Sequence, residues 1–144
     1  MLILDTDHLT IIQRRSEPAY SSLRSRLKMY SEEDVCSTII NFEEQMRGWL
    51  SAVASAKDGD KEIKAYRNLR LSLSFFQDMR LLDYDEAAKI QFFSLQKSRI
   101  RVGTMDLKIA AIAISQNARL LSRNLKDFQK VPALMVEDWT IAVS

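Results

Sequence analysis

Cysteine and histidine are almost absent from this sequence, which has one of each, Cys36 and His8. A single cysteine excludes an internal disulfide framework and fits a reducing compartment. A single histidine excludes a histidine-rich metal site and any catalytic triad that needs further histidines. Because Cys36 lies in an apolar, strand-like run, we expect it in the core rather than acting as a nucleophile.

Glycine and proline are also scarce, with three and two residues. Neither G-x-G-x-x-G nor G-x-x-x-x-G-K-[ST] occurs, so the phosphate-binding loops of dinucleotide-binding and P-loop proteins have no support. No apolar run reaches transmembrane length, and no basic segment followed by an apolar one marks a signal peptide. We therefore expect a cytoplasmic protein without a membrane partner. The net charge of +2 permits a nucleic-acid partner without requiring one.

What the sequence does contain is an alternation of short apolar runs with longer amphipathic segments. The expected strands are residues 1–4, 34–37, 80–84, 119–122 and 134–136. The expected helices are residues 6–14, 18–30, 38–56, 61–78, 85–98 and 107–116, the last preceded by an N-cap at Asp106. This alternation indicates a three-layer α/β/α fold with a mainly parallel sheet of four to five strands. At 144 residues the chain suits a single domain, residues 1–144.

Two of the expected helices carry apolar stripes. On the helix over residues 38–56 the stripe is Phe42, Met46, Trp49, Leu50 and Val53. On the helix over residues 61–78 it is Ile63, Tyr66, Leu69, Leu73 and Phe76. We expect Tyr66, Phe75 and Phe76 to lie in the core.

The first seven residues end an apolar run abruptly in Asp5-Thr6-Asp7. The run is too short for a helix and is typical of a buried strand. In open α/β sheets, ligands bind outside the carboxyl ends of the strands, so these carboxylates are placed for chemistry. The alternative is that Thr6 or Asp7 only caps the next helix.

Carboxylates or their amides stand at four places where strands end or helices begin. They are Asp5 with Asp7, Glu43 with Glu44, Asp106, and Asn124 with Asp127. Clustered carboxylates repel one another unless a cation holds them, and oxygen-only coordination favours Mg²⁺ or Mn²⁺. Each acid taken alone is better explained by a favourable interaction with a helix N-terminus than as a metal ligand, so the prediction depends on the set.

Four motifs in order resemble those of PIN domains, and most closely those of the VapC toxins of bacterial toxin–antitoxin pairs. The motifs are Leu4–Asp7, Ser37–Gly48, Gly103–Ala111 and Leu121–Phe128. The resemblance covers nearly the whole chain. It implies a metal-dependent ribonuclease on a PIN fold, a homodimer, and inhibition by a small VapB-like antitoxin.

The resemblance also implies roles for particular acids. Asp5 matches the first metal ligand and Asp106 the third. Glu44 matches the second because it stands four residues before a glycine, although Glu43 lies nearer the apolar stripe of its helix. The fourth position departs from the common pattern, because Asn124 stands where many members have Asp. Asp127, three residues later, is then the expected fourth acid.

The remaining candidates are supporting or substrate-binding residues. They are Thr6, Asp7, Thr104, Asn124, Arg123 and Lys126. Asp7 departs mildly from the family, in which Asn is usual at that site. The basic residues suit contacts with an RNA phosphate backbone. Two other interpretations stay open: a haloacid-dehalogenase-like phosphatase, which Asp5-Thr6-Asp7 also resembles, and a catalytically inert PIN-fold interaction module.

Overall fold

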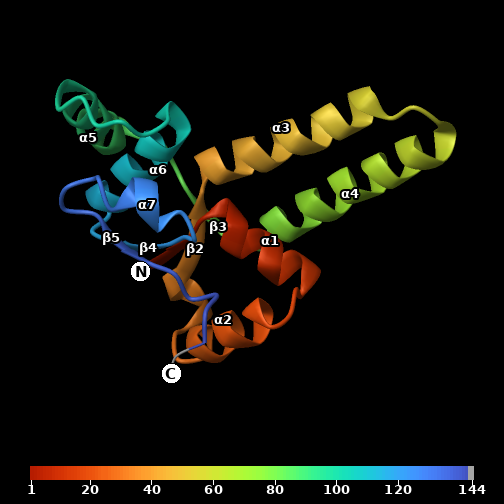
Figure 1. Ribbon diagram of the computed structural model, residues 1–144, viewed down its shortest axis with the longest axis horizontal. Helices are drawn as coiled ribbons and strands as arrows, with labels where there is room; N and C mark the ends of the chain where they lie inside the picture. The colour runs from red at the N-terminus through yellow and green to blue at the C-terminus, as the bar shows by residue number, and fades with distance from the viewer. Residues whose placement is uncertain (143–144) are drawn as a thin grey trace.

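Five short strands form one fully parallel sheet in the order β3-β2-β1-β4-β5 (Figure 1). The computed structural model describes residues 1–142, so the last two residues of the predicted domain lie outside the described residues. The strands are β1 (Leu2–Leu4), β2 (Val35–Thr38), β3 (Arg80–Leu82), β4 (Arg119–Leu121) and β5 (Met135–Glu137). The predicted α/β class and the upper estimate of five strands are confirmed.

Helices cover both faces of the sheet, because the strand residues alternate between two apolar clusters. Ile3 packs into the cluster beneath α5 (Glu86–Lys97), α6 (Thr104–Ser115) and α7 (Leu125–Phe128). Leu2 and Leu4 pack into the cluster beneath α1 (Thr6–Arg14) and α2 (Ala19–Leu27). Cys36 is fully buried in the first cluster, as expected. A short 3₁₀ turn, η1 (Glu32–Asp34), leads into β2.

The long helices α3 (Ile39–Ser55) and α4 (Gly59–Gln77) form a hairpin that projects from the body of the molecule (Figure 1). Several of its large apolar side chains are exposed, among them Leu50 and Leu71. Phe76 is 5% exposed, whereas Tyr66 is 55% exposed and Ile63 is 58% exposed. The prediction of a core position is right for Phe76 and wrong for Tyr66, because an apolar stripe is buried only where another element reaches it.

Several predicted helix ends shift in the structure. Helix α2 ends at Leu27 rather than near Tyr30, and α4 begins at Gly59 because the Asp58 side chain caps it. Helix α6 begins at Thr104 with Gly103 as its N-cap, so Asp106 lies in the first turn and is not the cap. Within residues 1–142, no helix has the length and apolar character needed to cross a bilayer.

Candidate active site

The carboxyl ends of the two central strands bring the first and last sequence motifs together. Leu4 of β1 pairs with Leu121 of β4, and the Asp5 amide donates to the Leu121 carbonyl at 2.9 Å. The residues that follow these strands, Asp5 and Ser122, are therefore neighbours. Strand β2 pairs with the other side of β1 and leads directly into α3.

Asp5 is buried, with only 6% of its surface exposed, and three groups donate to its carboxylate. Oδ1 accepts from the Thr6 amide at 2.9 Å and from Asn41 Nδ2 at 2.8 Å, while Oδ2 accepts from the Ser122 hydroxyl at 2.7 Å. Burial still raises the pKa of Asp5, since desolvation outweighs these hydrogen bonds. Asp5 is itself the N-cap of α1, so the expectation that Thr6 or Asp7 caps this helix is wrong.

Glu44 is the glutamate of α3 that faces this site. Its Oε1 accepts from the Thr6 hydroxyl at 3.4 Å. Burial, together with repulsion from Asp5 and Asp106, raises the pKa of Glu44 to about 7. Glu43 instead forms an ion pair with Arg47, four residues further along the helix. The geometry thus separates two adjacent glutamates that the helical stripe alone did not.

Asp106 approaches the same acids from the first turn of α6. Burial is the main reason that the pKa of Asp106 rises to about 6, and repulsion from Asp5 adds to it. The Asn124 amide donates to Asp106 Oδ2 and to Asp127 Oδ2, each at 3.2 Å. Asn124 therefore links the third acid to the expected fourth one as a hydrogen-bond donor.

Asp127 lies at the rim of the site in the short helix α7. Its side chain is 37% exposed, and its Oδ1 lies 3.4 Å from Lys130 Nζ. The hydrogen bond from Asn124 lowers the pKa of Asp127, and Lys130 acts in the same direction. The environment of Asp127 is therefore opposite to that of Asp5, Glu44 and Asp106, whose pKa values are all raised.

Asp7 holds the loop after β4 in place. Its Oδ2 accepts from the Arg123 amide at 2.9 Å, and its Oδ1 lies 2.6 Å from His8 Nδ1. His8 is fully buried, and its Nε2 accepts from the Trp139 amide at 3.2 Å. With Nε2 accepting, the ring hydrogen directed at Asp7 is assigned to Nδ1.

The other predicted supporting residues near the site are Thr104, Arg123 and Lys126. Thr104 is exposed at the first residue of α6, two residues before Asp106. Arg123 contributes its backbone amide to Asp7, and its side chain and that of Lys126 are exposed.

Sequence reasoning missed two buried residues that position Asp5. Asn41 is fully buried and donates to both Asp5 and Thr6, and Ser122 is fully buried and donates to Asp5. A signal was present for each of them. Asn41 interrupts an apolar stretch inside the second motif, and Ser122 directly follows a strand beside Asn124.

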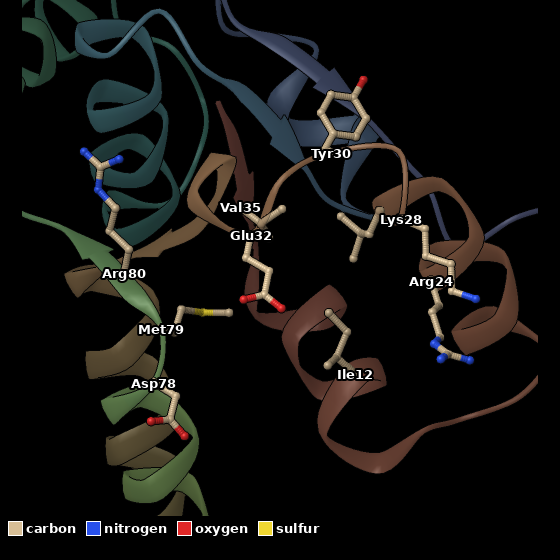
Figure 2. Close-up of a pocket in the computed structure, with 10 residues that line it drawn as sticks. Ile12, Arg24, Lys28, Tyr30, Glu32, Val35, Asp78, Met79 and Arg80 are labelled. Atoms are coloured by element: carbon tan, nitrogen blue, oxygen red, sulfur yellow. The ribbon is translucent and has the colours of Figure 1, made fainter.

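A hollow of about 690 Å³ lies at the opposite edge of the sheet (Figure 2). Val35 and Arg80, which line it, are the first residues of β2 and β3, whereas the acids follow the carboxyl ends of strands. Its charged residues are of both signs, for example Arg24 and Glu32. The concentration of buried carboxylates, and not the size of a hollow, distinguishes the site at the other edge.

Comparison with known proteins identifies the family of this chain. The family model of the PIN domain matches residues 2–134. The chain belongs to the PIN-domain family. The four motifs described above all fall within the matched residues of this PIN domain.

Relatives of this PIN domain include proteins named as nucleases. It is 31% identical over 84 residues to the tRNA(fMet)-specific endonuclease VapC of Salmonella typhimurium, a match that spans 56% of this chain and 64% of the relative. It is 27% identical over 142 residues to the enzyme of the same name from Shigella flexneri, spanning 96% of this chain and 97% of that one.

Solved structures give the same result for the fold. The DNA-bound VapBC complex from Salmonella typhimurium contains a chain that superposes with a TM-score of 0.73 at 26% identity, covering 96% of this chain and 97% of that one. VapBC-1 from nontypeable Haemophilus influenzae gives a TM-score of 0.71 at 22% identity, covering 97% and 98%.

The donor set of this PIN domain fits a hard divalent cation. Asp5, Glu44 and Asp106 offer only carboxylate oxygens; repulsion from Asp5 raises the pKa of both Glu44 and Asp106, and Asp106 also raises that of Glu44. Among residues 1–142, no three acidic, histidine or cysteine side chains are already close enough to enclose an ion. Mg²⁺ does not need such a cage, because it keeps several waters and takes one or two carboxylates directly.

The fourth position of this PIN domain can be tested by metal titration. Asp127→Asn should weaken Mg²⁺ binding, because a hard cation gains more from an anionic oxygen than from an amide. Asn124→Ala should affect binding less and turnover more, and Asn124→Asp should preserve or tighten binding. Isothermal titration calorimetry of the three variants measures this. Binding by Asp127→Asn as tight as that of the parent would leave a site of three carboxylates.

Proposed function

We propose that this protein is an endoribonuclease dependent on Mg²⁺ or Mn²⁺ and the toxin component of a VapBC-type toxin–antitoxin pair. The observation that supports this most directly is the convergence of Asp5, Glu44 and Asp106. Their carboxylates are partly or fully buried and repel one another, so the charge of a bound cation stabilises all three at once. Asp127 is included as the fourth acid of the site.

The chain's own residues position the acids and contact the RNA substrate. Asn41 and Ser122 hold the Asp5 carboxylate between them, and the Thr6 hydroxyl donates to Glu44. Bound Mg²⁺ or Mn²⁺ supplies water activation and neutralises charge on the phosphate. Lys126 and Arg123, exposed beside the acids, are suited to contacts with the RNA backbone. No protein nucleophile is required.

We infer the RNA substrate and the antitoxin partner from the names of the related proteins and structures. Two of them are named as tRNA(fMet)-specific endonucleases, and others as ribonucleases. The similar structures include complexes named VapBC, that is, toxin with antitoxin. We extend both properties to this chain, with tRNA(fMet) as the first substrate to test.

The two other interpretations from sequence are weaker. Membership of the PIN-domain family argues against a haloacid-dehalogenase-like phosphatase. An inert PIN-fold module would have no need for three mutually repelling acids, one of which, Asp5, is held by the buried donors Asn41 and Ser122.

The experiment is cleavage of purified RNA by purified protein. tRNA(fMet) and a mixture of other tRNAs are incubated with Mg²⁺, with Mn²⁺ or with EDTA, and the fragments are mapped at their ends. We expect cleavage with either cation and none with EDTA. Cleavage that persists in EDTA contradicts the metal mechanism, and intact RNA under every condition supports the inert module.

A further inference from the structure

A groove leads away from the acidic residues along helices α1, α3 and α4. It consists of two hollows, of about 310 Å³ and about 460 Å³, which share Gln13, Arg14 and Trp49. The smaller hollow includes Thr6 and Glu44, and the larger one extends to Lys64 and Asn68. We call this the Trp49 groove. It runs from the candidate site outward along the projecting hairpin.

The walls of the Trp49 groove are held in place before any ligand binds. The side-chain amides of Gln13 on α1 and Gln45 on α3 hydrogen-bond to each other at 3.0 and 3.1 Å. The hydroxyl of Ser72 on α4 donates to Gln45 Oε1 at 3.1 Å. Three helices are thereby fixed to one another. A ligand that fills the groove therefore does not have to order its walls.

The two tryptophans of the chain differ in their surroundings. Trp139 is buried, stacked by the Arg26 guanidinium at 4.5 Å, and paired with the Tyr30 ring. Trp49 is only partly buried, and within residues 1–142 the ring–ring and cation–ring contacts do not include it. Trp49 lines both hollows of the groove, where a planar group can contact it.

Apart from Glu44 at the end nearest the acids, the charged residues of the groove are positive. Arg14 and Lys64 are exposed, and the ion pairs formed among the described residues use other cations. An aromatic face next to free cations is the combination that binds single-stranded nucleic acid, with bases stacking and phosphates meeting the charges.

We propose that the Trp49 groove binds an unpaired nucleotide of the RNA substrate next to the scissile phosphate. The base stacks on Trp49, and backbone phosphates lie near Arg14 and Lys64. Trp49 follows Glu44 by five residues on α3, a rise of about 7.5 Å, which suits a nucleotide adjacent to the one being cleaved. The proposal rests on the proposed ribonuclease function, and it makes a single-stranded stretch of RNA the preferred substrate.

Binding is measured with the protein's own fluorescence. Because Trp139 is buried, a short single-stranded RNA of mixed sequence should quench mainly Trp49. The Asp5→Asn protein is used so that the RNA stays intact. We expect quenching by the single strand and much less by the same sequence as a duplex.

Substitutions then test the groove in the otherwise unchanged enzyme. Trp49→Ala should weaken RNA binding by about five- to a hundredfold and raise KM with kcat near that of the parent. Trp49→Phe should retain most of the affinity. Leu50→Ala, the next residue on α3 and 56% exposed, is the matched control and should behave like the parent. Arg14→Gln with Lys64→Gln should reduce the salt dependence of binding without removing the aromatic face.

The outcomes separate the failure of this proposal from the failure of the function. If the parent cleaves RNA and Trp49→Ala cleaves it with an unchanged KM, the subsite is wrong and the ribonuclease stands. If the parent cleaves no RNA, the function itself fails. If Trp49→Ala binds RNA normally but loses binding of the antitoxin protein, the groove is a peptide site and the proposal is overturned. Circular dichroism establishes that Trp49→Ala is folded, and the double charge variant gives an independent measurement if it is not.

Discussion

Asp5→Asn will abolish ribonuclease activity while leaving the fold intact. The substitution removes the charge of the most buried acid, yet its amide oxygen can still accept from Asn41 and from the Thr6 amide. Loss of a residue that only supports a metal ligand typically lowers metal affinity or activity 10–100-fold, so loss of a direct ligand should lower activity by at least about a hundredfold. Initial rates on an RNA that the parent cleaves measure the effect.

The control for Asp5→Asn is an acid of the same type outside the site. Asp60 lies in the first turn of α4, near the tip of the hairpin, and is exposed. Asp60→Asn should keep the parent's rate. Without metal, Asp5→Asn should unfold at or above the parent's temperature, because a buried carboxylate has been replaced by a neutral group. Parent-like cleavage by Asp5→Asn would remove Asp5 from the mechanism.

Glu44→Gln and Glu43→Gln will have very different effects although the residues are adjacent. Glu44 faces Thr6 and interacts with Asp5 and Asp106, whereas Glu43 pairs with Arg47. Glu44→Gln should lower kcat/KM by about a hundredfold. Glu43→Gln should leave it within about twofold, since an exposed ion pair contributes little. The reverse order would mean that the helical stripe, and not the family pattern, identifies the functional glutamate.

The same pair of variants should differ in the pH dependence of stability. The Glu44 carboxyl has a pKa of about 7 in the folded protein against 4.5 ordinarily, so the folded state binds more protons between these values. The free energy of unfolding of the metal-free protein should therefore fall as the pH rises from about 4.5 to 7. Glu44→Gln should flatten this fall, and Glu43→Gln should not. Thermal unfolding in EDTA at pH 5 and pH 8 measures the difference, and Mg²⁺ should restore the parent's stability at pH 8.

The parts of the fold that the sequence predicted are those determined by local pattern. The strands around Ile3 and Leu120 are short apolar runs that pair in a parallel sheet as expected. Exposure of the hairpin was not predictable in this way. Tyr66 and Phe76 belong to one stripe, and what separates them is whether another element reaches that turn of the helix.

The sequence also predicted only part of the candidate site: it predicted the acids but not the residues that position them. Asp5, Glu44 and Asp106 could be named in advance because each sits in a recognisable short motif. The groups that hold them could not, because Asn41 reaches Asp5 from 36 residues away and Ser122 from 117. The setting of Asp127 depends on Lys130 and on an amide of Asn124 that is shared with Asp106.

The central place of β1 in the sheet also fixes when, during synthesis, the acids can assemble. Asp5 is made before the groups that position it, because β1 must pair with β4, and Ser122 follows Asp5 by 117 residues. At about 5–20 residues per second, a ribosome adds that stretch in roughly 6–23 s. Throughout that interval the nascent chain carries its first acid without the strand and hydroxyl that position it. A ribosome that makes this protein is thus not exposed to an assembled nuclease on its own unfinished product.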